Sequence, residues 1–148
     1  MQRRIFMLAA TVAIGMSTIG ATRAFSADAA VTSLKCPVSG KAVDAEKFSD
    51  YNGGKVYFCC DVCKGKFDKD SAAFAAKANH QLVASGQFAQ KACPFTGGKT
   101  KDGTEVDVAG VKVSFCCMNC KGKAAKATGD DQVKLVFGDA FAKGFAKK

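Results

Sequence analysis

The stretch "YFCCDVCKGKF", residues 57–67, places three cysteines within five positions, directly after an aromatic pair. Residues 114–124 repeat the pattern as "SFCCMNCKGKA". Each stretch has the pattern of a strand end followed by the first turn of a helix. Thiols clustered at such a turn serve either metal ligation or disulfide bonding, and the choice between them largely decides the function.

From Cys36 onward the chain is a tandem repeat with a constant offset of 57 residues. Comparing residues 36–66 with 93–123 gives 14 identical positions of 31, without a gap. The period is too long, and two copies are too few, for a solenoid, so we predict two copies of one small domain. The predicted boundaries are a first module at 30–84, a linker at 85–92 and a second module at 93–148.

Each module has the same predicted order of elements. It opens with Cys-Pro-x-(Ser/Thr)-Gly, which is typical of a tight turn. A glycine turn then leads into a strand, Val56–Phe58 in the first copy and Val111–Phe115 in the second. Residues 105–108 supply the other strand of a hairpin in the second copy, and alanine- and lysine-rich helices follow within 61–84 and 119–145. We therefore expect an α+β fold in which each module runs from a cysteine knuckle through a β-hairpin to a helix.

The cysteines are the candidate ligands of a metal site in each module. A module of this size gains little stability from burial alone, so a metal or disulfide staple is expected. Cys59 and Cys63 lie four residues apart, on one face of a helix, near its N-terminus, where the dipole favours the thiolate that binds metal. Soft sulfur ligands suit zinc or copper(I), and we expect one ion per module. The eight candidates are Cys36, Cys59, Cys60, Cys63, Cys93, Cys116, Cys117 and Cys120.

Residues 1–29 have the order of a secretory signal peptide: two arginines, an apolar stretch at 5–19, and small residues up to Ala24 and Ala29. The paired arginines also suit the twin-arginine export route. The apolar stretch is short for a transmembrane helix, so we expect no stable membrane span after cleavage. Cleavage after Ala29 would change the formal charge from +9 to +7. The predicted location is periplasmic, with the lysines on the surface and no nucleic acid as partner.

Two alternatives to metal binding stay open on the sequence alone. In an exported chain of this size, eight cysteines could form four disulfides, in any of 105 pairings. The pairs Cys60/Cys63 and Cys117/Cys120 could exchange disulfides, although no βαβ setting surrounds them. The clustering of the thiols favours ligation, and the spacings match no common iron–sulfur pattern. The alternative functions are thus a disulfide- or zinc-stapled interaction module and a thiol–disulfide redox protein.

The single histidine, His80, leaves little capacity for acid–base catalysis near neutral pH, so we expect that the protein is not an enzyme. The repeat counterpart of His80 is Phe137. A ligand essential to the module would recur in both copies, so we expect His80 to pack on a helix instead. Phe58 and Phe115 are expected core residues behind the cysteine turns.

The motifs "CPVSGK", "VYFCCDVC" and "KGKF" in the first copy, with "CPFTGG" and "SFCCMNC" in the second, resemble the YHS/TRASH family of small metal-binding domains. The resemblance covers about 36–80 and 93–140. It implies treble-clef-like modules that handle heavy metals, often copper. It also implies a metal transporter or another envelope protein as partner.

The chain departs from the family pattern at one position of the knuckle. The family's cysteine there aligns with Ser39 in the first copy and Thr96 in the second. On this resemblance, three cysteines in each copy rank above Cys60 and Cys117 as ligands. They are Cys36, Cys59 and Cys63 in the first copy, and Cys93, Cys116 and Cys120 in the second. Cys60 and Cys117 then either complete a four-thiolate site or leave a three-thiolate site with an open position.

Overall fold

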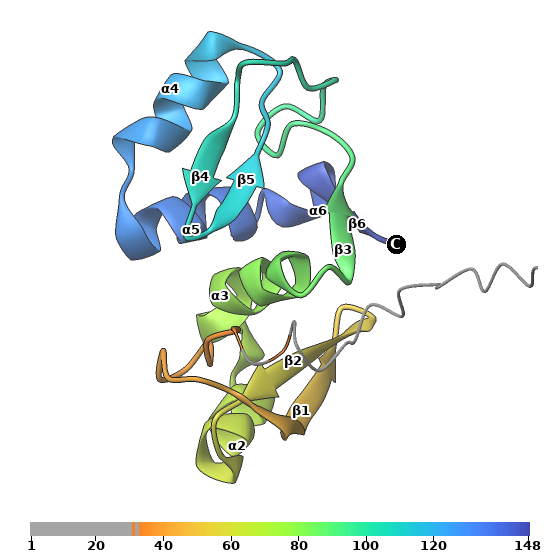
Figure 1. Ribbon diagram of the computed structural model, residues 1–148, viewed down its shortest axis with the longest axis vertical. Coiled ribbons are helices and arrows are strands. Elements are labelled where there is room, and N and C mark those ends of the chain that lie inside the picture. Colours follow the sequence, from red (N-terminus) through yellow and green to blue (C-terminus); the bar gives the residue numbers. More distant parts are fainter. Residues whose placement is uncertain (1–30, 32) are drawn as a thin grey trace, which may run out of the picture.

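The computed structural model describes residues 31 and 33–148, so the predicted signal peptide lies outside the described residues. Each copy of the repeat forms one lobe, and the two lobes are stacked along the long axis of the molecule (Figure 1). Both lobes combine a two-stranded antiparallel hairpin with helices. The α+β prediction is confirmed, while the treble-clef assignment stays a prediction. None of the helices in the described residues is long and apolar enough to cross a membrane.

The first lobe consists of one hairpin and two consecutive helices. Its elements are β1 (Asp44–Tyr51), β2 (Gly54–Phe58), α2 (Asp61–Lys69) and α3 (Ser71–Ala84). The hairpin turns at Asn52-Gly53, and both residues have the positive φ that a tight hairpin turn requires. Val56 and Phe58 of β2 are fully buried. The partner strand β1 is largely polar, so no apolar alternation in the sequence reveals it.

The second lobe repeats this arrangement with shorter strands. Its elements are β4 (Val106–Val108), β5 (Val111–Val113), α4 (Met118–Lys126), α5 (Gly129–Phe137) and α6 (Phe141–Gly144). The turn between β4 and β5 is Ala109-Gly110, the counterpart of Asn52-Gly53, and again has positive φ at both residues. Phe115, like Phe58 in the first lobe, is fully buried, as the sequence predicts.

The predicted helix over 131–145 is interrupted. The chain leaves α5 at Gly138, forms the single turn of α6, and ends in β6 (Phe145–Lys147), which pairs with β3 (Phe88–Gln90). At Gly144 a side chain has no room, because a Cβ there would lie 2.8 Å from the Cα of Pro94. β3 lies inside the segment expected to be a linker, so this segment is built into the second lobe (Figure 1).

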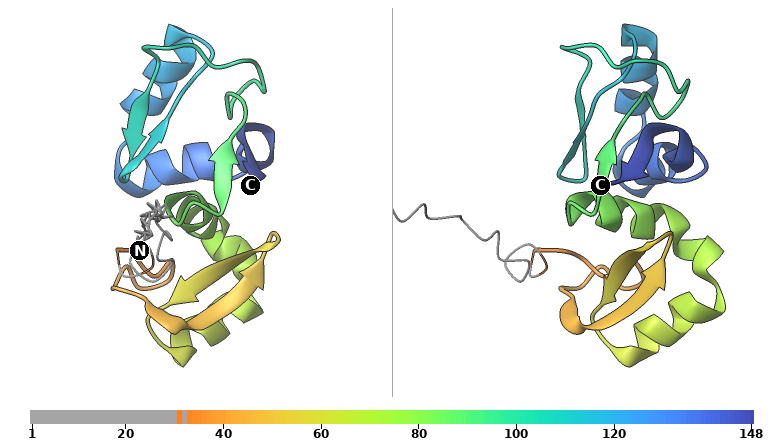
Figure 2. Two further views of the ribbon diagram at one scale, coloured as in Figure 1. Left: turned by 45° about the vertical axis from the view of Figure 1, so that its right-hand side comes forward. Right: turned by 90° about the vertical axis from the view of Figure 1, so that its right-hand side faces the viewer.

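The two lobes meet through helices that correspond in the repeat. α3 packs along α5, and the views in Figure 2 place both helices at the junction. The ring of His80 meets the ring of its counterpart Phe137 edge-on, with 5.1 Å between centroids. Asn79, nearly fully buried, donates to the Phe137 carbonyl at 2.8 Å and accepts from Asn52 at 3.0 Å. Contacts between residues at corresponding positions of the two lobes indicate that an approximate two-fold axis relates the lobes.

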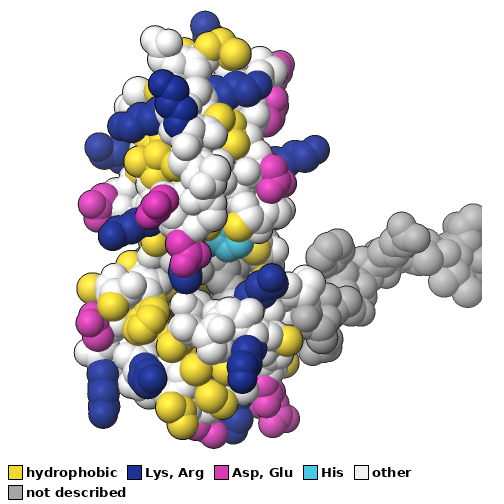
Figure 3. Space-filling model, turned by 90° about the vertical axis from the view of Figure 1, so that its left-hand side faces the viewer, with side chains coloured by type: hydrophobic (Ala, Val, Ile, Leu, Met, Phe, Trp, Pro, Cys, Tyr) yellow, Lys and Arg dark blue, Asp and Glu magenta, His cyan; other side chains and the backbone are white. Residues whose placement is uncertain are grey.

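The single histidine lies in the hollow between the lobes, where it is coloured cyan in Figure 3. His80 Nε2 lies 3.1 Å from the carbonyl oxygen of Val108, and because a carbonyl can only accept, this nitrogen donates. The absence of a histidine at the counterpart position predicts that His80 packs on a helix, and its ring contact with Phe137 of α5 confirms this prediction. Burial lowers the pKa of His80 below its usual value, against smaller opposing effects of Val108, Ala109 and Asp107.

The lowered pKa of His80 predicts a loss of stability on acidification. Above about pH 6.5 the imidazole is neutral in both folded and unfolded chains, and its packing contributes in full. As the pH falls, the unfolded chain takes up the proton first, so the free energy of unfolding decreases by at most about 1.4 kcal/mol per pH unit. Urea unfolding at several pH values checks this. His80→Gln, which keeps a donor for Val108, should reduce the slope just below pH 6.5; an unchanged slope there would contradict the assignment.

Candidate metal centres

Three cysteines in each lobe converge on one point. The sulfurs of Cys36, Cys59 and Cys63 all lie within 4.8 Å of one another. The sulfurs of their counterparts form a second cluster of the same size: Cys93, Cys116 and Cys120. Two sulfurs bound to one tetrahedral zinc ion at about 2.3 Å lie about 3.8 Å apart, a separation of the same size as those within each triad, so each triad could hold a metal ion.

The first ligand of each triad is held in a tight turn. The Cys36 N–H donates to the Lys41 carbonyl and its own carbonyl accepts from Gly40 N–H, both at 2.8 Å. Gly40 has a φ of 71°, which explains the glycine of the Cys-Pro-x-x-Gly motif. The turn at Cys93 is closed by equivalent bonds. Both cysteines are buried, so the turn points its sulfur inward, toward the strand end.

The other two ligands lie at the strand–helix junction. Cys59 follows β2 directly, and Cys63 lies in the first turn of α2, with 3.6 Å between their sulfurs. The corresponding distance between Cys116 and Cys120 is 3.8 Å. The two sulfurs therefore converge at a strand–helix junction, and not on one helical face as the sequence predicts, because Cys59 lies before the helix.

Cys60 and Cys117 lie outside the triads. Their sulfurs are 3.7 Å and 3.8 Å from those of Cys59 and Cys116, but they do not join the clusters. Each is the N-cap residue of the following helix, in an extended backbone conformation. The backbone N–H of Cys63 is the main cause that lowers the pKa of Cys60. These two cysteines are thus neighbours of the triads, at the helix starts.

A hydroxyl adjoins each triad instead. The Ser39 Oγ lies 3.1 Å from the Cys59 sulfur, and the Thr96 Oγ1 lies 3.2 Å from the Cys116 sulfur. Both residues are exposed. The sequence singles out these two positions, because the YHS/TRASH motif that the chain resembles has a cysteine there.

The thiols of the first triad differ in acidity. Burial raises the pKa of Cys36, but the hydroxyl of Ser39 and the backbone N–H groups of Ser39 and Cys59 outweigh it and bring the pKa to about 7. Burial raises the pKa of Cys63 to about 12, and contacts with Cys59 and Cys60 add to this effect. The triad thus joins a thiol that ionises near neutral pH to one that stays protonated there.

The second triad repeats this division. Burial raises the pKa of Cys93, yet the backbone N–H of Cys116 and the groups of Thr96 bring it to about 7. The pKa of Cys120 rises to about 12, chiefly through burial and then through contacts with Cys117 and Cys116. All eight cysteines of the chain are free thiols in the structure, so the donors of both triads are available to a metal ion.

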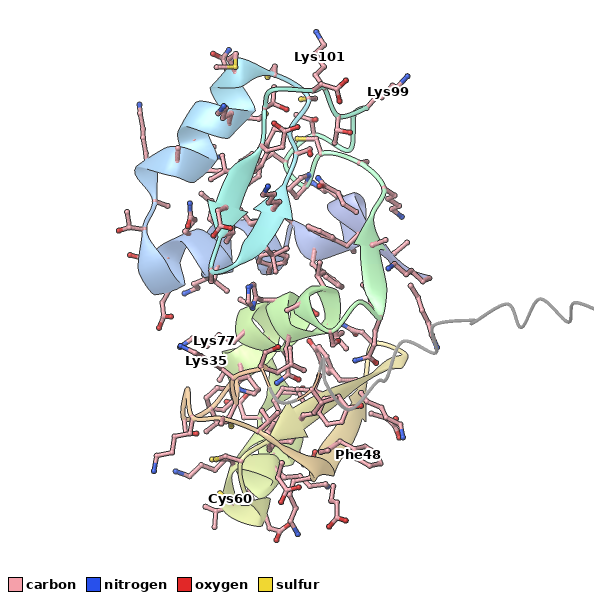
Figure 4. All side chains as sticks on the ribbon, in the orientation of Figure 1. Lys35, Phe48, Cys60, Lys77, Lys99 and Lys101 are labelled. Atoms are coloured by element: carbon pink, nitrogen blue, oxygen red, sulfur yellow. The ribbon has the colours of Figure 1, made fainter. Side chains whose placement is uncertain are left out.

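The two centres lie at opposite ends of the molecule. Figure 4 places Cys60, beside the first triad, at the lower end, and Lys99 and Lys101, which follow the Cys93 turn, at the upper end.

Comparison of the chain with models of protein families, with curated proteins and with solved structures gives no match. The case for metal binding therefore rests on the residues of the two triads.

Proposed function

We propose that this is an exported protein that binds one copper or zinc ion in each module and serves in metal buffering, delivery or resistance rather than catalysis. The observation that carries the proposal is the occurrence of the same three-thiol cluster twice, from counterpart residues. The four cysteines of the first copy are all retained in the second, although 17 of the 31 compared positions differ. Soft thiolates select copper(I) and zinc among the common ions.

The environment of the triads favours exchange of the metal over a purely structural site. Structural zinc sites are closed by four Cys or His ligands, whereas exchangeable or reactive sites keep a position open. Here the neighbours of each triad are an exposed hydroxyl, Ser39 or Thr96, in contact with one of the three sulfurs, and the thiol of Cys60 or Cys117. A hydroxyl is a weaker ligand than a thiolate for a soft ion, so a partner thiol could displace it.

The proposed setting follows from the same family resemblance. We place the protein among YHS/TRASH-like modules, in the periplasm, with a metal transporter or another envelope protein as partner. The knuckle, hairpin and helix order of each lobe supports this placement. Should the triads prove closed around zinc, the modules would instead be stapled interaction domains.

A second candidate function is thiol–disulfide exchange. It is favoured by Cys60 and Cys117, which cap the helix starts in Cys-x-x-Cys pairs and have a lowered pKa, chiefly through the backbone N–H groups of Cys63 and Cys120. A redox protein would turn over a disulfide substrate and lose this activity on Cys60→Ser or Cys117→Ser. A metal-binding protein would keep its metal in both variants.

The deciding experiment is a metal and free-thiol count on mature protein from the exported fraction, purified without added metal. We expect about two copper or zinc ions per chain, one for each triad, with the thiols blocked until a chelator is added. Replacing all three first-triad cysteines with serine should remove one ion, while the matched change Cys60→Ser should remove none. Protein with neither metal nor free thiols would overturn the proposal in favour of a disulfide-stapled module.

A further inference from the structure

A buried glutamine ties together the two segments that carry the ligands of the first centre. Gln81 on α3 is almost fully buried. Its Nε2 donates to the carbonyls of Lys35 at 3.0 Å and Tyr57 at 2.9 Å, and its Oε1 accepts from Tyr57 N–H at 2.7 Å. Lys35 directly precedes Cys36, and Tyr57 lies two residues before Cys59. One side-chain amide thus joins the cysteine turn to the end of the strand.

A second glutamine makes the same three bonds in the other lobe. The Nε2 of Gln90 donates to the carbonyls of Ala92 at 3.0 Å and Ser114 at 2.6 Å, and its Oε1 accepts from Ser114 N–H at 2.9 Å. Ala92 directly precedes Cys93, and Ser114 lies two residues before Cys116. The bonded backbone groups are therefore the exact repeat counterparts of those that Gln81 holds.

The two glutamines themselves are not counterparts. The repeat offset of 57 takes Gln81 to Gly138 and takes Gln90 back to Ser33. Gln81 comes from the helix that packs between the lobes, whereas Gln90 comes from β3, which pairs with β6. Because duplication did not copy the residue, its recurrence cannot be a remnant of the repeat. The feature that recurs is the bonding pattern around the cysteines.

We propose that Gln81 and Gln90 are positioning residues, each of which sets the geometry of one metal centre. The inference rests on the proposed metal-binding function. Cys36 and Cys59 belong to segments far apart in sequence, and the amide of Gln81 fixes the separation of their backbones. Outer partners that orient ligands in this way typically change metal affinity by about 10–100-fold when they are lost.

A third glutamine, Gln87, supplies a matched control because it bonds to the same strand. The Oε1 of Gln87 accepts from Lys55 N–H at 2.6 Å and its Nε2 donates to the Lys55 carbonyl at 2.8 Å. Lys55 lies on β2, two residues before Tyr57, so Gln87 binds the same strand with the same chemistry. Its bonds to the backbone do not reach a cysteine turn.

The test uses the full chain in which the three cysteines of one triad are replaced with serine, so that the metal affinity of the other centre is measured alone. Zinc affinity comes from competition with a chromophoric chelator, and cobalt(II) spectra report the coordination of the ion. Gln81→Met should weaken the first centre by about 10–100-fold and leave the second within about twofold, and Gln90→Met should do the reverse. Gln87→Met should change neither centre by more than about twofold.

A metal-free measurement separates failure of this inference from failure of the proposed function. Dibromobimane links two thiols only when they lie close together, so the yield of the Cys36–Cys59 link, mapped by mass spectrometry, reports the geometry of the empty triad. The yield should drop in Gln81→Met and stay unchanged in Gln87→Met. If zinc and cobalt do not bind the wild type but the yields follow this pattern, metal binding is wrong and the positioning role stands. Equal effects of Gln81→Met and Gln87→Met on yield, or equal losses of affinity at both centres, would overturn the positioning role.

Discussion

Replacing Ser39 with cysteine is expected to raise the zinc affinity of the first centre by more than about 100-fold. The Ser39 hydroxyl already lies 3.1 Å from the Cys59 sulfur, so a thiol there would reach the triad without a change of backbone. Three sulfurs would become four, which is the complete ligand set of structural zinc sites. A direct ligand should contribute more than an outer partner, whose loss costs about 10–100-fold.

The measurement is zinc affinity by chelator competition together with the rate at which the chelator removes the bound ion. Ser39→Cys should slow this removal at the first centre only, and Thr96→Cys should act in the same way at the second. Ser39→Ala is the matched control and should leave the three-thiolate site in place. If Ser39→Cys binds zinc no more tightly than the wild type, the hydroxyl does not occupy the fourth position, and the candidate for that position would again be Cys60.

Replacing Phe137 with alanine is expected to lower the free energy of unfolding by about 3–5 kcal/mol. Phe137 is fully buried at the junction of the lobes. Its ring meets the ring of His80 on the first lobe and that of Phe145 on β6, with centroids 5.1 Å and 5.2 Å away. Truncation leaves a cavity between three elements, and packing on both sides limits how far they can close it.

Urea unfolding followed by circular dichroism measures this effect, on metal-free protein so that ligation does not contribute. Phe48→Ala is the control: Phe48 is half-buried on the hairpin, against Tyr57 and under the ammonium of Lys55, and its loss should cost clearly less. If Phe137→Ala lowers the free energy of unfolding by no more than Phe48→Ala does, the contact between the lobes contributes little to stability.

The elements that the sequence predicts are those with a strong local signal. The predicted strands Val56–Phe58 and Val111–Phe115 have β-branched and aromatic residues after a glycine turn, and helices rich in alanine and lysine follow. The second strand is shorter than predicted, because β5 ends at Val113. β1 carries too few apolar residues for the alternation that marks a strand. β3 and β6 are three residues each and exist through their mutual pairing, which joins segments far apart in sequence.

The same division between local and distant signals applies to the candidate centres. The sequence predicts Cys59 and Cys63 on one helical face, but Cys59 lies before α2, so their convergence depends on the strand–helix junction. The turn at Cys36 follows from its proline and glycine. The bonds of Gln81 and Gln90 span 24 residues to the strand ends. A glutamine on a helix or in a short linker strand carries no sequence mark of such a contact, so the structure was needed to find it.

The pairing of β3 with β6 gives the two centres different requirements for chain length. Every residue that forms or holds the first triad lies at or before Gln81. The second triad depends on Gln90, and β3, which carries Gln90, finds its partner strand only when Phe145–Lys147 have been made. The first centre therefore needs the chain only as far as Gln81, whereas the second needs the final element of the described fold.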